Sequence, residues 1–506
     1  MVLLGRRLHL GGKSEDLPTA LPKSALPMAC QQYAPRGLGA TDSIPHQRFC
    51  KKTIYIHTKR MKKNYSTLLF STALVAAVSF TMPAAAQQTE YTDGVFMLNE
   101  GYFGKERATI NYLDQSGKWH YRLPLRTATG TAQLGTTGCY ATIADGNMYI
   151  VSKKLNLTKP NDDDATFTVC DAKTLEVKAQ INNIATSGNV VTADGRAFLP
   201  LTDLKKGYLS TTNGVYVINL LTNEVASHIE GTDGIANNQT GNMVYANGKV
   251  FAVDKTRGIL VIDTATDKLL KTINNEPEGG TYCSIVTAKD GSLWLTAGTA
   301  AGGTAKHLVK LNADTYETEN IALADDVFPP TNSWGAWNPD CFTASPNENV
   351  LYWNGATGAW ASGQHIYKYD IDNNTTTLLV DYSNSTDEKK PYVYGAACRV
   401  NPYDGNLYIS VTLGSAWGNE SELRVIDTNN GQQKGAYPME VNFWYPEMPV
   451  FALRSDATAI SAISDAEGNI TEVARYSIDG KRLQKPQPGL NIVRFSDGSV
   501  KKVMVR

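Results

Sequence analysis

The chain repeats one arrangement of apolar and polar positions. In GILVIDTATDKLLKTI, residues 258–273, an apolar run ends in an aspartate, a polar turn follows, and a second apolar run begins. Short runs rich in β-branched residues and bounded by polar turns are typical of β-strands. We therefore predict two antiparallel strands, with the aspartate accepting hydrogen bonds from the backbone of the turn between them.

This unit occurs seven times, with copies that start at residues 94, 146, 195, 248, 291, 349 and 405. The polar residue that ends its third strand recurs every 44 to 58 positions, as Asp114, Asp171, Asn219, Asp263, Asn312, Asp370 and Asp427. A period of this size that contains only short strands is typical of a β-propeller. We expect these polar residues to form turns rather than to catalyse a reaction.

Each unit also needs an innermost strand. We predict these strands just upstream, at 138–144, 188–193, 241–246, 281–288, 340–345 and 395–401. The first unit has no such segment before it, but PVFALR, residues 449–454, follows the seventh unit and is otherwise unassigned. The predicted fold is therefore all-β: a seven-bladed β-propeller over residues 94–454, closed by pairing of its N- and C-terminal strands. Closure removes the open sheet edges that promote aggregation.

The connections differ between the two ends of the predicted strands. One end has tight, uniform turns such as Asp145-Gly146 and Asn247-Gly248. The other end has irregular loops at 101–107, 155–165, 204–212, 298–306, 355–364 and 414–421, and between blades at 325–340, 382–395 and 439–449. Variable loops on a rigid scaffold commonly build binding surfaces, so we place the functional face there.

Aromatic residues gather in or beside these loops. The predicted ligand-binding set is Tyr102, Phe103, Trp334, Trp337, Trp360, Tyr394, Trp417, Trp444 and Tyr445. Clusters of exposed aromatic side chains mark interaction sites, and the alternative is that individual rings pack over the ends of neighbouring blades. Trp353 lies within a strand and is expected in the core. Asn99, Glu100 and Asp340 are predicted at the mouth of the central channel.

Signals for catalysis are weak. The sequence has no HExxH, GxSxG or P-loop motif, so we assign no catalytic residue and no metal site. The five cysteines after residue 86 have no paired spacing and are expected to be small buried hydrophobes. A binding protein is favoured over an enzyme. The enzyme alternative is a lactonase-like or lyase-like propeller that uses carboxylates at the channel mouth.

The N-terminal region has a different composition. Residues 1–86 hold twelve Lys and Arg against three Asp and Glu, and residues 87–506 hold 36 against 46, a net charge of −10. That negative charge argues against nucleic-acid binding. Residues 61–86 combine two lysines, an apolar segment and Ala84-Ala85-Ala86, which is the layout of a cleaved signal peptide. We interpret residues 1–60 as a non-native upstream extension and expect an exported protein.

Residues 455–506 break the repeat and predict a small antiparallel β module. Tyr476, Asp479-Gly480, the run 489–493 and Lys501-Lys502-Val503 carry a resemblance to C-terminal modules of exported Bacteroidetes proteins. Those modules include the sorting domains read by the type IX secretion system. The resemblance implies a location at the cell surface or in the periplasm.

The repeat GxVxVIDxxTxxxxxxI resembles the YncE-like propellers that are often labelled surface-layer proteins. Residues 94–114, with Asn99-Glu100-Gly101 after the first strand, are similar to the secreted Bacteroidetes branch of that family. Some members capture cobalamin and pass it to an outer-membrane transporter. The resemblance therefore implies cobalamin or a related corrinoid as ligand, bound by rim aromatics and amides. We predict no cofactor. A glycan is the other ligand class, because sugar rings also stack on exposed tryptophan.

Overall fold

The computed structural model describes most of the chain after residue 88. The described residues are 89–102, 105–153, 165–182, 184, 195–233, 240–254, 256–275, 281–298, 304–328, 330, 342–355, 363–455, 472–477, 481–483, 485–495 and 500–505. The predicted signal peptide and upstream extension lie outside them. All the regular secondary structure assigned within these ranges consists of β-strands. This part of the chain contains no helix long and apolar enough to cross a membrane.

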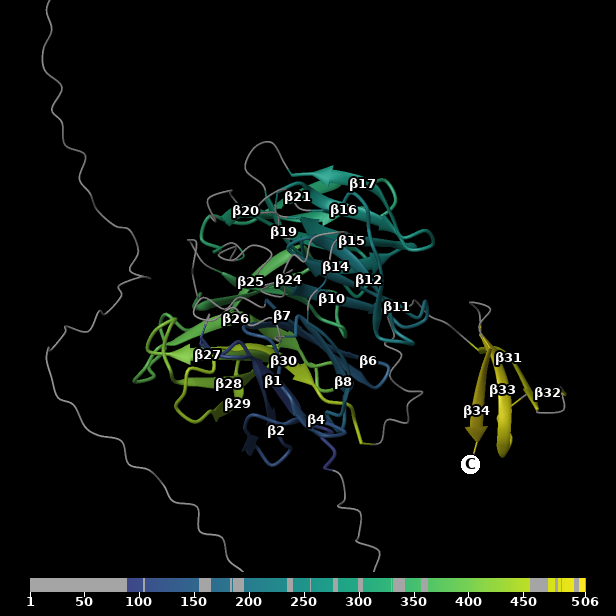
Figure 1. Cartoon of the computed structure of the whole chain (residues 1–506). Helices are drawn as coiled ribbons and strands as arrows, with labels where there is room; N and C mark the ends of the chain where they lie inside the picture. The colour runs from purple at the N-terminus through teal and green to yellow at the C-terminus, as the bar shows by residue number, and fades with distance from the viewer. Residues whose placement is uncertain are drawn as a thin grey trace, which may run out of the picture. The chain divides into compact units, whose positions relative to one another are not determined.

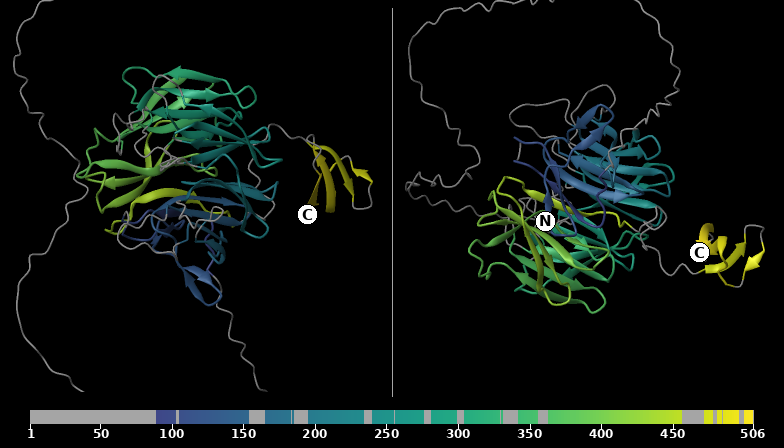
Figure 2. Two further views of the ribbon diagram at one scale, coloured as in Figure 1. Left: turned by 45° about the horizontal axis from the view of Figure 1, so that its top comes forward. Right: turned by 90° about the horizontal axis from the view of Figure 1, so that it is seen from below.

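Between residues 95 and 451 the described strands form seven four-stranded antiparallel sheets (Figures 1 and 2). The first contains β30 (Pro446–Phe451), β1 (Val95–Asn99), β2 (Thr109–Leu113) and β3 (Trp119–His120). The second contains β6 (Gly138–Ala144), β7 (Asn147–Ser152), β8 (Phe167–Asp171) and β9 (Val177–Ile181). The third contains β10 (Gly195–Leu201), β11 (Lys206–Thr211), β12 (Gly214–Asn219) and β13 (Glu224–His228).

The remaining four sheets each follow the chain order. The fourth contains β14 (Thr240–Ala246), β15 (Lys249–Asp254), β16 (Gly258–Asp263) and β17 (Lys268–Asn274). The fifth contains β18 (Thr281–Thr287), β19 (Leu293–Gly298), β20 (Thr304–Leu311) and β21 (Thr318–Ala322). The sixth contains β22 (Phe342–Ala344), β23 (Val350–Gly355), β24 (His365–Asp370) and β25 (Thr375–Asp381). The seventh contains β26 (Pro391–Val400), β27 (Leu407–Leu413), β28 (Ser421–Ile426) and β29 (Gln433–Pro438). A hairpin of β4 (Leu125–Thr127) and β5 (Gly130–Ala132) follows the first sheet.

The first sheet combines strands from opposite ends of residues 95–451. β30 pairs antiparallel with β1, with Val95 opposite Phe451 and Leu98 opposite Met448. The pairing continues past the strand, where the Ala452 amide donates to the Gly94 carbonyl at 3.0 Å. β30 begins three residues before the predicted segment 449–454, and its first five residues are buried.

Neighbouring sheets are joined by apolar cores. Phe96 and Ile110 of the first sheet pack with Met148 and Ile150 of the second. Val95 and Met97 of that same first sheet pack with Leu423 of the seventh. The innermost strands also contact one another in the order β30, β6, β10, β14, β18, β22, β26 and again β30. The fold is therefore all-β and propeller-like, as the repeat predicted.

The polar residues that end the third strands form turns, as predicted. Each accepts a hydrogen bond from a backbone amide two or three residues later, which is the geometry of an Asx turn. The Asp263 carboxylate accepts from the Thr266 amide at 3.1 Å, and the Asn219 side chain accepts from the Leu221 amide at 2.8 Å. The same pattern holds at Asp114, Asp171, Asn312, Asp370 and Asp427.

These turns predict an acid-sensitive fold. Hydrogen bonds from the Ser116 hydroxyl and the Thr266 hydroxyl lower the pKa of Asp114 and Asp263, and the Asn429 amide lowers that of Asp427. A lowered folded-state pKa stabilises the fold above the unfolded-state pKa of about 3.9, and this stabilisation is lost as the pH falls through the folded-state value. We expect the melting temperature to fall steeply below about pH 4.

Replacing carboxylates by amides tests this cause. Asn219 and Asn312 already form the same turn, so Asp263→Asn, Asp370→Asn and Asp427→Asn together should keep the fold at pH 7. The melting temperature of the variant should fall less between pH 5 and pH 3 than that of the unmodified chain. The reason is that the variant has fewer carboxylates that bind a proton when the chain unfolds. Equal acid-induced losses in the two proteins would contradict the assignment.

The third sheet differs from the prediction. The predicted inner strand 188–193 lies outside the described residues, and β10 occupies the inner position instead. Residues 206–211, predicted as part of the loop 204–212, form β11. A turn with Lys205 at φ 55° precedes β11, and Gly207 is required because a Cβ there would lie 2.3 Å from the Phe198 ring. The polar residues and the glycine suggested a loop. In the structure the polar residues form a tight turn, and the glycine lets β11 pack against Phe198.

The C-terminal residues form a separate four-stranded sheet. Its order is β32 (Arg482–Leu483), β31 (Glu472–Ser477), β33 (Gly489–Phe495) and β34 (Val500–Val505). Val493 and Asn491 on β33 are buried, and Arg475 on β31 donates from Nη1 to Asn491 Oδ1 at 3.3 Å. This sheet therefore buries one of its two faces.

Candidate functional site

Five aromatic rings from separate parts of the chain meet beside the pairing of β1 and β30. This aromatic cluster consists of Tyr102, Tyr394, Trp417, Phe443 and Tyr445. Tyr445 is central, with its ring centroid 5.3 Å from Tyr394, 6.0 Å from Phe443 and 6.2 Å from Tyr102. Trp417 meets Tyr394 edge-on at 6.3 Å. The strands that carry or flank these residues, β1, β26, β27 and β30, lie side by side (Figures 1 and 2).

Backbone hydrogen bonds fix the loops that carry the cluster. The Glu100 amide donates to the Tyr445 carbonyl at 2.8 Å, and the Gly101 amide donates to the Trp444 carbonyl at 3.1 Å. Tyr445 has φ 46°, a left-handed conformation that is costly for a residue with a side chain and that clusters at functional sites. Its hydroxyl donates to the Trp417 carbonyl at 3.3 Å. The rings are therefore held in place by the junction of the first and seventh sheets.

The cluster has an exposed upper layer. Trp417 is 49% exposed and Phe443 is 38% exposed, whereas Tyr394 and Tyr445 are buried beneath them. Lys105 places its ammonium 4.1 Å from the ring centroid of Tyr102, so a cation borders the aromatic surface. The exposed rings of the cluster therefore rest on buried rings that are already held in place.

A buried ionic layer lies below the rings. It contains Glu100, Lys153, Arg196 and Glu447, all almost fully buried. The Tyr394 hydroxyl donates to Glu100 Oε2, and Lys153 Nζ lies 3.9 Å from Glu100 Oε1. Glu100 and Lys153 directly follow the second strands β1 and β7, and Arg196 and Glu447 lie near the starts of the inner strands β10 and β30. All four therefore lie at the same end of their sheets. Lys153 and Glu100 offset each other's charge, which helps to permit their burial.

The glycine next to Tyr394 allows this packing. Gly395 has φ 59°, and a Cβ at this position would lie 2.1 Å from Glu447 Oε2. A side chain there would therefore displace Glu447 from the layer. Tyr394 thus donates to Glu100, while Gly395 leaves space for Glu447.

Burial keeps the tyrosine hydroxyls and the cysteine thiol of the site in their neutral forms. Burial and the Glu100 carboxylate raise the pKa of Tyr394, so its hydroxyl remains a hydrogen-bond donor. Burial raises the pKa of Tyr445 to about 12. It also raises the pKa of Cys139 to about 12, so this thiol is not an activated nucleophile. Among the described residues, His, Cys, Asp and Glu form no group of three that could hold a metal ion.

The structure brings together four of the predicted aromatic residues, namely Tyr102, Tyr394, Trp417 and Tyr445. Glu100 lies below them, and Asn99 is buried at the end of β1, where its Nδ2 donates to Thr109 Oγ1 at 3.2 Å. The remaining predicted residues Phe103, Trp334, Trp337, Trp360 and Asp340 lie outside the described part of the chain.

Trp444 belongs to a different environment. It is buried in the core between the first and seventh sheets, and its ring stacks on Tyr121 at 5.4 Å. The Arg122 guanidinium lies 4.3 Å from the ring centroid, and Trp444 Nε1 donates to the Glu440 carbonyl at 3.0 Å. Trp444 therefore packs over the ends of neighbouring sheets rather than lining the cluster.

Sequence reasoning missed several members of the site. Phe443 directly precedes Trp444 and Tyr445, so the aromatic run itself was the available signal. Glu447 interrupts an otherwise apolar strand, which marks a buried charge that needs partners. Lys153 and Arg196 had no comparable local signal, because residues of other sheets lie next to them.

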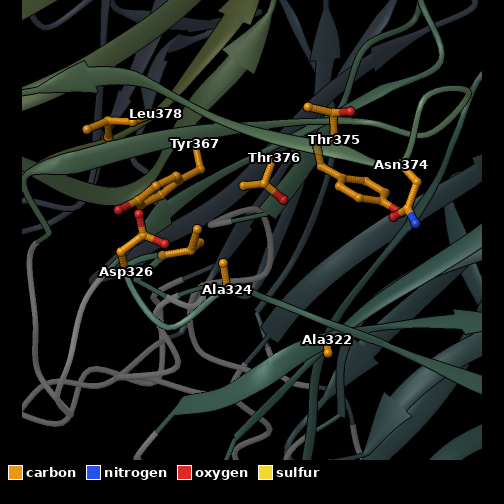
Figure 3. Close-up of a pocket in the computed structure, with 10 residues that line it drawn as sticks. Ala322, Ala324, Asp326, Tyr367, Asn374, Thr375, Thr376 and Leu378 are labelled. Atoms are coloured by element: carbon orange, nitrogen blue, oxygen red, sulfur yellow. The ribbon is translucent and has the colours of Figure 1, made fainter.

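A hollow lies between the fifth and sixth sheets (Figure 3), and its lining includes none of the cluster residues. This hollow has a volume of about 400 Å³. One side is formed by the end of β21 and the residues that follow it, and the other side by β24, β25 and the turn between them. Tyr369 and Tyr367 form part of its lining. The Tyr369 hydroxyl donates to Asn374 Oδ1 at 2.7 Å, and the Tyr367 hydroxyl accepts from the Phe328 amide at 3.2 Å. Both rings are almost fully buried, so the hollow offers little aromatic surface.

Comparisons with known proteins give one family. Residues 93–452 match the profile of the family described as "Domain of unknown function (DUF5074)". No curated protein matches the chain significantly. Among solved structures, the computationally designed Ika8 protein aligns with a TM-score of 0.40 at 10% identity, covering 82% of this chain and 100% of that one. A chain of the Mitotic Checkpoint Complex aligns with a TM-score of 0.40 at 12% identity, covering 72% of this chain and 89% of that one.

Proposed function

The chain belongs to the DUF5074 family, and we propose that it is an exported, non-catalytic protein that binds a ligand on the aromatic cluster. The observation that carries this proposal is the exposure of Trp417 and Phe443 above buried rings. Exposed aromatic side chains of this size lose much of their contact with water when a ligand covers them. Because the supporting rings are already ordered, little conformational entropy is lost on binding.

We also infer that the propeller is closed and seven-bladed. The supporting observations are the pairing of β1 with β30 and the core shared by the first and seventh sheets. In a closed ring, the pairing of β1 with β30 holds the two ends of the domain together. Both ends contribute residues to the aromatic cluster. Closure thus explains why the site lies at this junction.

Cobalamin or another corrinoid is the ligand that we propose to test first. The resemblance to YncE-like propellers of the secreted Bacteroidetes branch suggests it, and a large, flat macrocycle suits a surface of aromatic rings. In this proposal an outer-membrane transporter would receive the ligand. A glycan is the second candidate, because the exposed ring of Trp417 can also stack against a sugar.

Titration of residues 87–506 with cyanocobalamin, followed by tryptophan fluorescence, tests this function. We expect saturable quenching and at least a tenfold loss of affinity in Trp417→Ala, since burying an aromatic ring contributes roughly 1.5–3 kcal/mol. Tyr403→Ala is the matched control. Tyr403 is 48% exposed but lies in the turn between β26 and β27, at the opposite end of β27 from Trp417.

The variants separate the outcomes. Loss in Trp417→Ala with unchanged affinity in Tyr403→Ala would support the site. Equal losses in both variants, or no response at micromolar corrinoid, would contradict corrinoid binding by this cluster. Glycans would then be the next ligands to titrate against the same pair of variants.

A further inference from the structure

The C-terminal sheet differs in charge from the rest of the exported chain. Residues 472–506 contain eight Lys and Arg against three Asp and Glu, a net charge of +5. Residues 87–454 contain 28 against 40, a net charge of −12. An anionic surface would therefore attract the C-terminal sheet and repel the propeller-like part.

The strand register places three of these cations on one face. Arg482, Tyr476, Ile492 and Lys502 pair directly across the four strands, so their side chains share a face. Arg494 lies two residues after Ile492 on β33 and therefore projects to the same side. Arg482, Arg494 and Lys502 are exposed, whereas Tyr476 and Ile492 are partly exposed.

The opposite face of this sheet is its packed side. Arg475, Asn491 and Val493 project there and are buried. Asn491 Nδ2 also donates to the Gln487 carbonyl at 2.8 Å, so the loop before β33 closes over this side. The cations of the first face are thus not needed to build the module's own core.

We propose that this basic face, formed by Arg482, Arg494 and Lys502 around Tyr476 and Ile492, docks on an anionic lipid membrane. The cations bind headgroup phosphates, and the planar guanidinium groups of the two arginines can each bind two phosphate oxygens. Tyrosine is favoured at membrane interfaces, and Ile492 adds apolar area. A soluble polyanion would use the cations equally but would gain little from these two apolar groups. The inference does not depend on ligand binding by the aromatic cluster.

Co-sedimentation of residues 87–506 with vesicles tests the proposal. The vesicles contain phosphatidylcholine with or without about one third phosphatidylglycerol. The test variant replaces the basic face by Arg482→Gln, Arg494→Gln and Lys502→Gln. The control removes three positive charges from elsewhere in the same module by Lys481→Gln, Lys485→Gln and Lys501→Gln, in which Lys501 lies on the opposite face.

The unmodified chain should bind only the anionic vesicles, and binding should weaken with added salt. The basic-face variant should bind at least tenfold more weakly, and the control variant no more than about threefold more weakly. Equal loss in both variants would overturn the proposal. So would binding to pure phosphatidylcholine, or binding to polyphosphate without binding to vesicles. The salt dependence of the unmodified chain is a test that does not rely on a variant.

Discussion

A chain that covers residues 87–445 is expected not to fold, whereas residues 87–455 should unfold cooperatively. The difference is strand β30, which forms the innermost strand of the first sheet. Met448 and Val450 on β30 are buried, and the shorter chain would leave β1 without its inner neighbour. Both apolar cores that border the first sheet would lose the side chains of β30. The free energy lost would exceed the usual net stability of roughly 5–15 kcal/mol.

Circular dichroism during heating distinguishes the two chains. Residues 87–455 should show a single sharp transition, since the removed C-terminal residues form their own sheet. Residues 87–445 should show no cooperative transition and should bind a hydrophobic dye. A sharp transition in the shorter chain, at a temperature close to that of the longer one, would contradict the role assigned to β30.

Trp353→Ala is expected to destabilise the fold by about 3–5 kcal/mol. Trp353 on β23 is completely buried, and its ring stacks on Tyr367 at 5.5 Å. Its Nε1 also donates to the Phe328 carbonyl at 3.0 Å. The substitution would open a large cavity in the core between the fifth and sixth sheets and leave a buried carbonyl without that donor.

Trp417→Ala is the matched substitution for this measurement. The same residue type is half exposed in a loop, so its removal should change the free energy of unfolding by less than about 1 kcal/mol. Urea unfolding of both variants gives the comparison. Similar losses in the two variants would mean that Trp417 is a structural residue, and the proposed binding surface would lose its main support.

Much of the fold was predictable because its signals are local. The strands at 258–263 and 268–274 needed only an apolar pattern and the polar turn between them. Asp145-Gly146 and Asn247-Gly248 form tight turns in which both residues have positive φ, which such sequences favour. The third sheet was mispredicted because Gly207 serves a contact with Phe198, and no local pattern reveals that contact.

The site was predictable only in part. Loop position and residue type identified Tyr102, Trp417 and Tyr445, but they could not show which rings would meet. That depends on β30 returning to β1 across almost the whole domain. The buried charges Lys153 and Arg196 were missed for the same reason, because strands from different sheets provide their environment.

The most direct test of the central claim is amide hydrogen exchange of residues 87–506 with and without saturating cyanocobalamin. Binding at the aromatic cluster predicts slower exchange around Tyr102, Trp417 and Tyr445, and unchanged exchange in the turns at 145–146 and 263–267. Those turns lie at the other end of the strands, so they serve as internal controls. Protection confined to those turns, or no protection anywhere, would contradict the account.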